Sequence, residues 1–354
     1  MKILIAGNLG YVGPSLVRQL RKTHPHSTLI GFDIGYFAHC LTNATALPEL
    51  DLDQQVFGDI RNFPEELLRG VDAVVNLAAI SNDPMSFQFE EVTMEINYRA
   101  CVNLARMAKA NGVKSFVYAS SCSMYGLADD TPRREGDKLN PLTAYARSKV
   151  AAEEALEQLA DEHFTVTCNR FATACGWSSR LRLDLVLNDF VAGSLVNKQI
   201  SILSDGTPWR PMINTRDMAR AMDWSTSRPA NVGGTFLAIN TGSNEWNTSI
   251  LALAEATAQV VPGVEITLNP DAPPDKRSYR ANFDLFKRLA PDHQPQEDLI
   301  STVKEIRDNL VAMDFSDANY RKSQLIRLEV IRRFLGEARL TPDLRWNRAI
   351  AEAR

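Results

Sequence analysis

The hydrophobic positions of the chain form short continuous runs that alternate with segments of helical periodicity. Between the first two runs, Leu16, Val17 and Leu20 recur at the spacing of one helix face. Strands alternating with helices in this way are typical of a parallel sheet with helices on both faces. We therefore predict an α/β protein with a doubly wound sheet, whose strands lie at 2–7, 28–33, 72–77, 115–121, 164–170 and 236–240.

A glycine-rich turn joins the first predicted strand to the first helix. Such a turn lets the backbone approach a pyrophosphate, which then lies at the helix N-terminus. The second strand ends in Asp33, whose carboxylate can accept hydrogen bonds from a ribose and would repel a 2′-phosphate. The pattern predicts bound NAD rather than NADP, and the alternative is a plain strand-to-helix turn. The turn residues that we assign to the cofactor are Gly7, Gly10, Tyr11, Val12 and Gly13.

Composition narrows the class of protein. The 354 residues are 45% hydrophobic and 23% charged, and a net charge of −4 argues against a nucleic-acid-binding surface. No apolar run approaches the ~20 residues that a membrane helix needs. The five cysteines form no C-x-x-C pair, which fits reduced thiols in the cytoplasm better than disulfides. We expect no bound metal.

Tyr145 and Lys149 are four residues apart and so share one face of a predicted helix at 142–163. A nearby ammonium lowers the pKa of a phenol, and a serine hydroxyl from Ser120 or Ser121 can bind the same substrate oxygen. Such a set interconverts an alcohol and a ketone. Tyrosine and lysine also occur at this spacing as solvated neighbours on ordinary helices, so the pair alone is a weak signal.

Together, G-x-x-G-x-x-G and Tyr-x-x-x-Lys resemble the extended short-chain dehydrogenase/reductase superfamily over residues 1–285. Most of its members act on nucleotide sugars. The resemblance implies that Tyr145 and Lys149 also contact the cofactor. It implies that Asn97 supports the active site, with a helix-packing amide as the alternative. It assigns further cofactor contacts to Asp59, Ile60, Leu77, Ala78, Ala79, Asn97 and Ser120.

The segment from Ser120 to Gly126 resembles the S-S-x-x-x-Y-G of nucleotide-sugar epimerases, which places the catalytic hydroxyl on Ser121. A simple helix cap is the alternative. In the 4,6-dehydratases of this branch an Asp-Glu pair comes directly after that hydroxyl. Here Cys122 and Ser123 stand there, so dehydration lacks its acid and base. We interpret Cys122 as a packing residue.

Resemblance also assigns the substrate-binding residues. Guanidinium groups suit a diphosphate, although Arg180 and Arg182 could equally be solvated surface charges. Arg210 lies in a D-G-x-x-x-R segment, and a second segment near 273–280 resembles one that closes over nucleotide ribose and phosphate. The full set that we expect is Ser121, Ser123, Thr173, Arg180, Arg182, Asn188, Arg210, Asp275 and Arg277.

We expect an NAD-binding domain at 1–175, to which a strand and helix return from about 212–240. A nucleotide-sugar domain would comprise 176–211 and 241–345, with a tail at 346–354. In the latter domain, 246–268 are expected to form a helix and a strand, and 296–336 a helical extension. Members of this branch usually pair two helices across a two-fold axis, here about 87–110 and 143–162, so we expect a homodimer.

The function that these features favour is an NAD-dependent nucleotide-sugar epimerase, with C4 as the preferred position, acting through transient oxidation to a keto-sugar. The main alternative is a net ketoreductase or dehydrogenase, which would use the same three residues. A 4,6-dehydratase and a non-catalytic NAD sensor are weaker alternatives.

Overall fold

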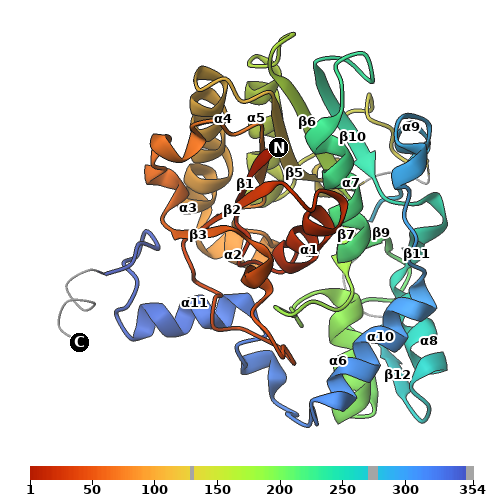
Figure 1. Ribbon diagram of the computed structural model, residues 1–354. Coiled ribbons are helices and arrows are strands. Elements are labelled where there is room, and N and C mark those ends of the chain that lie inside the picture. The colour runs from red at the N-terminus through yellow and green to blue at the C-terminus, as the bar shows by residue number, and fades with distance from the viewer. Residues whose placement is uncertain (128–130, 270–277, 348–354) are drawn as a thin grey trace.

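The computed structural model describes residues 1–127, 131–269 and 278–347. Its centre is a parallel sheet in which the strand order reverses between β1 and β4 (Figure 1). Ligands of open α/β sheets bind at such a reversal, beyond the carboxyl ends of the strands. In spatial order the strands are β10 (Phe236–Thr241), β6 (Thr165–Phe171), β5 (Ser115–Ser121), β4 (Ala73–Asn76), β1 (Lys2–Ala6), β2 (Thr28–Asp33) and β3 (Gln54–Phe57).

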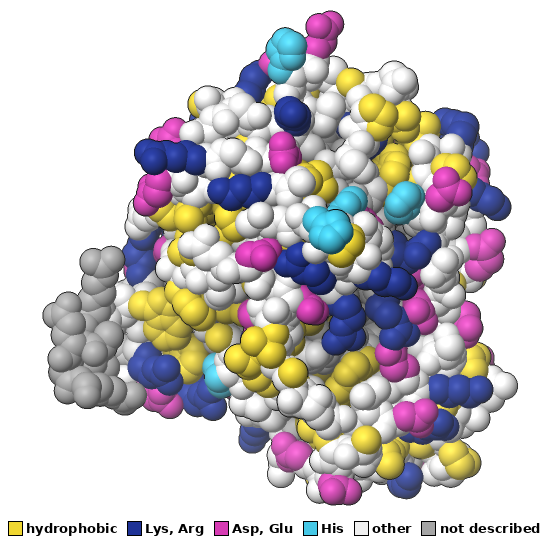
Figure 2. Space-filling view, viewed as in Figure 1, with side chains coloured by type: hydrophobic (Ala, Val, Ile, Leu, Met, Phe, Trp, Pro, Cys, Tyr) yellow, Lys and Arg dark blue, Asp and Glu magenta, His cyan; other side chains and the backbone are white. Residues whose placement is uncertain are grey.

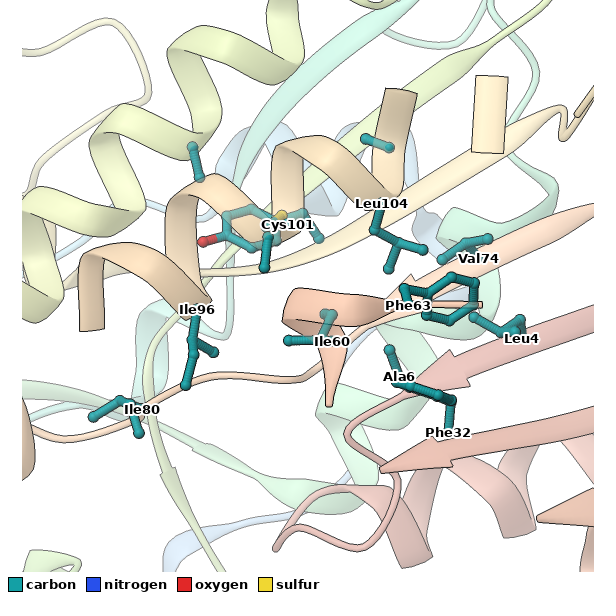
Figure 3. Packing of buried hydrophobic residues seen from close by; sticks show 14 of the residues in the cluster. Leu4, Ala6, Phe32, Ile60, Phe63, Val74, Ile80, Ile96, Cys101 and Leu104 are labelled. Carbon is teal, nitrogen blue, oxygen red and sulfur yellow. The ribbon is translucent and has the colours of Figure 1, made fainter. Parts of the chain in front are cut away.

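Helices cover both faces of this sheet, as the strand runs predicted. Side chains that alternate along β1 enter opposite cores: Leu4 and Ala6 pack on one face, and Ile3 and Ile5 on the other. Figure 3 shows the first core, where Phe32 and Phe63 lie between the strands and Leu104 of α4. That face carries α2 (Asp83–Gln88), α3 (Glu90–Met94), a π-helical turn (Glu95–Ala100), α4 (Cys101–Ala110) and α5 (Ala144–Glu157), and the other carries α1 (Gly13–Thr23), α7 (Thr215–Ser227) and α9 (Asp284–Leu289).

A smaller unit lies beyond the carboxyl ends of the strands, at the lower right of Figure 1. Its core joins residues such as Leu187, Leu253 and Ile306 from three helices. Two small sheets complete it. The elements are β7 (Thr173–Cys175), α6 (Val186–Val196), β8 (Gln199–Ile202), β9 (Trp209–Asn214), β11 (Asn247–Ser249), α8 (Ile250–Val260), β12 (Glu265–Leu268) and α10 (Leu299–Ala312).

After α10 the chain returns to the domain that contains the central sheet. Helix α11 (Arg327–Gly336) lies beside the segment that follows β2, away from α8 and α10 (Figure 1). Val330, Ile331 and Phe334 are buried in the same core as β1 and β2. The expected assignment of all of 241–345 to the nucleotide-sugar unit therefore differs from the packing, because apolar side chains from α9 and from 327 onward cover the first domain.

The ends of α5 also differ from the predicted 142–163. The helix begins at Ala144 because the Thr143 hydroxyl caps it, accepting a hydrogen bond from the Ala146 N–H at 3.2 Å. It ends at Glu157, and Asp161 and Phe164 then form an isolated bridge that turns the chain into β6. Helical periodicity in the sequence does not show these two local hydrogen-bond arrangements, so the predicted helix was too long at both ends.

Several short 3-10 helices connect these elements. They are Pro48–Asp51, Ile60–Asn62, Glu65–Leu68, Cys122–Tyr125, Asn244–Trp246, Pro291–His293 and Tyr320–Lys322. Basic and acidic side chains are interspersed on the face shown in Figure 2. This agrees with the nearly equal numbers in the sequence, 39 Lys and Arg and 43 Asp and Glu. Across the described part of the chain, no helix is both long and apolar enough to cross a membrane.

The start of α1 allows a stability test. A Cβ on Gly13 would lie 1.8 Å from the Asn8 carbonyl oxygen, so the glycine turn and the helix could not keep their spacing. We expect Gly13→Ala to lower the free energy of unfolding by about 1–3 kcal/mol. Gly136 has no heavy atom within 4 Å of such a Cβ, so Gly136→Ala is the matched control. Equal denaturant midpoints for the two variants would contradict this packing.

Candidate active site

A cavity of about 960 Å³ lies at the carboxyl ends of the central strands and extends to the smaller unit. Its wall includes Asp33 at the end of β2, Ala78 after β4, Ser121 at the end of β5 and Tyr145 on α5. The sheet therefore brings together residues that are far apart in the sequence. Of the predicted site residues, the cavity is lined by Gly7, Gly10, Tyr11, Val12, Asp33, Asp59, Ile60, Leu77, Ala78, Ala79, Ser120, Ser121, Ser123, Tyr145, Lys149, Thr173, Arg182 and Arg210.

The glycine turn forms one wall of this cavity. Gly7 has a φ of +87°, and a Cβ there would lie 2.5 Å from the Ala78 nitrogen, so only glycine lets the β1 and β4 turns approach this closely. Gly13 does not line the cavity but is needed for the packing of α1. The helix begins after Val12 with no side-chain cap and no acidic residue in its first turn. Its positive end is thus left for an anion.

Asp33 connects the second strand to the glycine turn. Its carboxylate accepts hydrogen bonds from the Leu9 N–H at 3.0 Å and the Gly35 N–H at 2.7 Å. Burial raises the pKa of Asp33, while these two hydrogen bonds oppose the change. The carboxylate lies on the cavity wall, where it can accept further hydrogen bonds from a ribose.

Asp59 lines the same end of the cavity, but its carboxylate is largely used within the protein. It caps the short helix Ile60–Asn62 and forms an ion pair with Arg61 at 2.6 Å. The groups that remain for a ligand are the edge of this carboxylate and the neighbouring backbone.

The catalytic candidates meet at the start of α5. The Lys149 ammonium donates a hydrogen bond to the Ala119 carbonyl oxygen at 2.6 Å and lies 4.5 Å from the centre of the Tyr118 ring. It is 5.5 Å from the centre of the Tyr145 ring. Ser121 caps the short helix Cys122–Tyr125, and its hydroxyl bonds that of Ser123 at 2.9 Å. Ser121 therefore both caps this short helix and lies on the cavity wall.

The sequence predicted that the Lys149 ammonium would lower the pKa of Tyr145, and the structure differs from this expectation. Burial raises the pKa of Tyr145 to about 12, and the hydrogen bond with Ser121 is the largest influence that lowers it. Lys149 is not among the leading influences, since its ammonium points to Ala119. Burial lowers the pKa of Lys149 itself from 10.5 to about 8. At neutral pH the protein alone thus holds a neutral phenol beside a buried ammonium.

Asn97 acts behind the cavity wall rather than on it. Its side chain accepts a hydrogen bond from the Ile80 N–H at 2.8 Å and donates to the Ile80 carbonyl oxygen at 3.0 Å. It also donates to the Ser148 hydroxyl at 3.1 Å. Asn97 therefore fixes the loop after β4 to α5, next to Lys149, from within a π-helical turn of the kind often found near functional sites.

The predicted substrate residues divide into three groups. Thr173, Arg182 and Arg210 join the serines on the cavity wall. Arg180 and Asn188 do not: Arg180 is paired with Glu49 at 2.6 Å, and Asn188 holds the Tyr11 hydroxyl and the Arg182 carbonyl oxygen. Asp275 and Arg277 lie outside the described residues, so their predicted role stays a prediction.

Four polar residues on the cavity wall were missed from the sequence: Ser81, Asn82, Asp83 and Asp184. Arg182 forms a bidentate pair with Asp184, both contacts being 2.9 Å, and donates to the Ser81 hydroxyl at 2.8 Å. Asn82 donates to Asp184 at 2.7 Å, and Asp83 accepts a hydrogen bond from the Thr143 hydroxyl at 2.8 Å. The signal was present, because a polar run directly after a buried parallel strand lies at the ligand-binding edge.

Cys122 lies outside the cavity. Its side chain is buried, and its thiol lies 3.0 Å from the Arg170 carbonyl oxygen. Burial raises the pKa of this thiol, so little thiolate forms near neutral pH. The packing interpretation fits this position.

Comparison with known proteins identifies the family. A model described as the NAD dependent epimerase/dehydratase family matches residues 3–240. The chain belongs to this family. A Bacillus subtilis protein described as an uncharacterized UDP-glucose epimerase, YtcB, is 28% identical over 257 residues, which are 69% of this chain and 78% of that protein.

Solved structures confirm the Rossmann-type fold of this family member. MoeE5 in complex with UDP-glucose and NAD matches with a TM-score of 0.75 at 22% identity, covering 88% of this chain and 99% of that one. UDP-glucuronic acid 4-epimerase from Bacillus cereus, in complex with UDP-glucuronic acid and NAD, has a TM-score of 0.74 at 24% identity. The match covers 88% of this chain and 100% of that epimerase chain.

As a member of this family the chain is an NAD-dependent enzyme of the epimerase/dehydratase class. The site fits the cofactor. The close approach of Gly7 to Ala78 leaves backbone rather than side chains on the wall, the uncapped start of α1 suits a pyrophosphate, and Asp33 suits a ribose.

The low pKa of Lys149 predicts a pH-dependent stability. Between pH 8 and 10.5 the unfolded chain binds a proton on this amine that the folded chain does not, so folding is favoured as pH rises. In protein freed of cofactor, Lys149→Met should gain stability relative to wild type at pH 7.5, and this gain should shrink by about 2 kcal/mol at pH 9.5. Urea unfolding measures it, with the exposed Lys138→Met as control. A difference that is constant with pH would contradict the buried ammonium.

Proposed function

We propose that this enzyme epimerises a nucleotide-diphosphate sugar at C4 by transient oxidation and reduction of the C4 carbinol. The observation that carries the proposal is that Ser121, Tyr145 and Lys149 share one cavity wall with the glycine turn. The ligands of the two similar structures, UDP-glucose and UDP-glucuronic acid, support a UDP-sugar as the substrate class.

When bound, NAD supplies the hydride acceptor, and its positive charge favours the phenolate form of Tyr145. The Tyr145 oxygen then takes the carbinol proton as the carbon is oxidised, and it returns that proton when the opposite face of the carbon is reduced. Ser121 donates a hydrogen bond to the same substrate oxygen and so stabilises the charge that develops there. Lys149, held by Ala119, keeps a positive charge behind this group.

Arg210 and Arg182 are proposed to face the substrate. Both line the cavity, and guanidinium groups match phosphate oxygens. Arg182 is neutralised by Asp184, so it offers a polar wall rather than a free charge. In this proposal Thr173 and Ser123 bind sugar hydroxyls, since both lie on the same wall.

The two residues after Ser121 disfavour dehydration. Removal of a sugar hydroxyl together with a carbon-bound proton needs an acid and a base at the reacting carbons. The two positions hold the buried thiol of Cys122 and the hydroxyl of Ser123. Neither group is a carboxyl, so oxidation and reduction at one carbon is the chemistry that the side chains support.

Two expectations stay predictions. One is a homodimer formed through the helical segments at about 87–110 and 143–162, and the other is a cytoplasmic location.

Replacing Tyr145 by Phe tests the mechanism. The variant should fold and keep its affinity for NAD and for UDP-glucose, while kcat falls by about 10²–10⁴-fold because only the proton-transfer hydroxyl is lost. Ser121→Ala should lower kcat by about 10²–10³-fold. Cys122→Ala is the control and should stay within a few-fold of wild type. Product analysis by NMR separates a C4 epimer from a net reduction product. Full activity of Tyr145→Phe, or an inactive but folded Cys122→Ala, would overturn the mechanism.

A further inference from the structure

The C-terminal segment reaches the cavity with a buried cation. Arg327, the first residue of α11, is 2% exposed and lies on the cavity wall. Its guanidinium stacks on the Phe37 ring, 4.8 Å from the ring centre. It donates to the Arg180 carbonyl oxygen at 2.7 Å and to the Gln324 carbonyl oxygen at 3.2 Å. The helix thus brings a charged group to a cavity wall that otherwise comes from earlier parts of the described chain.

In the described part of the chain, Arg327 differs from the two neighbouring arginines in having no carboxylate partner of its own. Arg180 is paired with Glu49, and Arg182 is paired with Asp184. Within the described residues, Arg327 forms no ion pair with a carboxylate.

A third buried carboxylate of this region, Asp33, lies near Arg180 and Glu49. The Arg327 charge is thus held by two carbonyl oxygens and the Phe37 ring, which is costly unless an anion arrives. Burial accordingly lowers the pKa of Arg327 to about 10.

The position of Arg327 indicates which anion this is. Phe37 belongs to the segment after Asp33, whose carboxylate is expected at the ribose. Arg327 binds the carbonyl oxygen of Arg180, which comes two residues after Ser178. The Ser178 hydroxyl donates to the Tyr11 carbonyl oxygen of the glycine turn at 2.6 Å. The glycine turn, where a pyrophosphate is expected, lines the same cavity. The anion expected beside the glycine turn is the pyrophosphate of the dinucleotide.

The segment that carries Arg327 is fixed to this same end. Trp346 donates its ring N–H to the Ile34 carbonyl oxygen at 2.7 Å, and the Tyr36 hydroxyl donates to the Leu344 carbonyl oxygen. Arg61 donates to the Asp343 carbonyl oxygen at 2.7 Å. The loop after Asp33 and the C-terminal segment therefore form one packed unit.

We propose that Arg327 is a cofactor-binding residue that forms an ion pair with the pyrophosphate of the dinucleotide. The C-terminal segment is then part of the NAD site and not only a covering of the first domain. Arg327 adds a charged contact from the side chain to those that the glycine turn makes through its backbone.

Affinity measurements test this assignment independently of turnover. NAD and ADP-ribose are titrated calorimetrically into full-length protein freed of cofactor, and UDP-glucose is titrated into the NAD-loaded protein. Arg327→Gln keeps a donor for the Arg180 carbonyl but removes the charge, and Arg327→Lys keeps the charge. The exposed Arg332 on the same helix is the control, as Arg332→Gln.

We expect Arg327→Gln to weaken the binding of both NAD and ADP-ribose by about 10- to 100-fold, which is the usual effect of losing a charge-assisted contact. Arg327→Lys should stay within about threefold of wild type, and Arg332→Gln and the binding of UDP-glucose should not change. Should circular dichroism show Arg327→Gln to be unfolded, Arg327→Met replaces it and is held to the same result.

Three results would overturn the assignment. If Arg327→Gln, or Arg327→Met in its place, binds NAD with wild-type affinity, Arg327 does not contact the cofactor. Equal loss in the Gln and Lys variants would assign Arg327 to packing. Weaker binding of UDP-glucose with unchanged binding of NAD would assign the charge to the substrate diphosphate. This result would not contradict the proposed epimerisation.

Discussion

The buried ammonium of Lys149 is the constraint on which the active site depends. An amine this deeply buried is costly, and here it is held by the Ala119 carbonyl oxygen and faces Tyr118. Four residues further along α5, Glu153 accepts a hydrogen bond from Ser120 at 2.5 Å and forms an ion pair with Arg170 at 2.7 Å. These contacts fix the register of α5 against the ends of β5 and β6. Because Tyr145 shares that helix face, its hydroxyl is brought to Ser121 by the same contacts.

The rest of the molecule completes the cavity that this helix borders. The reversal of strand order between β1 and β4 leaves a crevice beyond their ends, and glycine at position 7 lets the two turns approach. Asn97 fixes the loop after β4, and the small unit adds Arg182 and Arg210 on the other side. The C-terminal segment returns to the loop after β2. The walls of the cavity thus come from segments distributed along the described parts of the chain.

Much of the fold could be predicted because its signals are local. The strand after Met1, the glycine turn and the acid at the end of β2 are read within 33 residues, and all three line or build the cavity. The return of α11 was not predictable in this way, since apolar periodicity shows that Ile331 and Phe334 are buried but not against which core. For the same reason Arg180 was expected at the substrate, whereas its partner Glu49 is 131 positions away in the sequence. The pKa of Tyr145 likewise depends on burial and on where the Lys149 ammonium points.

The central claim is that one carbon is oxidised and reduced within one cavity, with the hydride kept there. Its most direct test uses UDP-glucose deuterated at C4 and the NAD-loaded enzyme, with the epimeric product examined by NMR and mass spectrometry. We expect deuterium to stay at C4 of the product, and we expect no absorbance at 340 nm from free NADH. Loss of the label to solvent, or its stoichiometric transfer to released NADH, would contradict it.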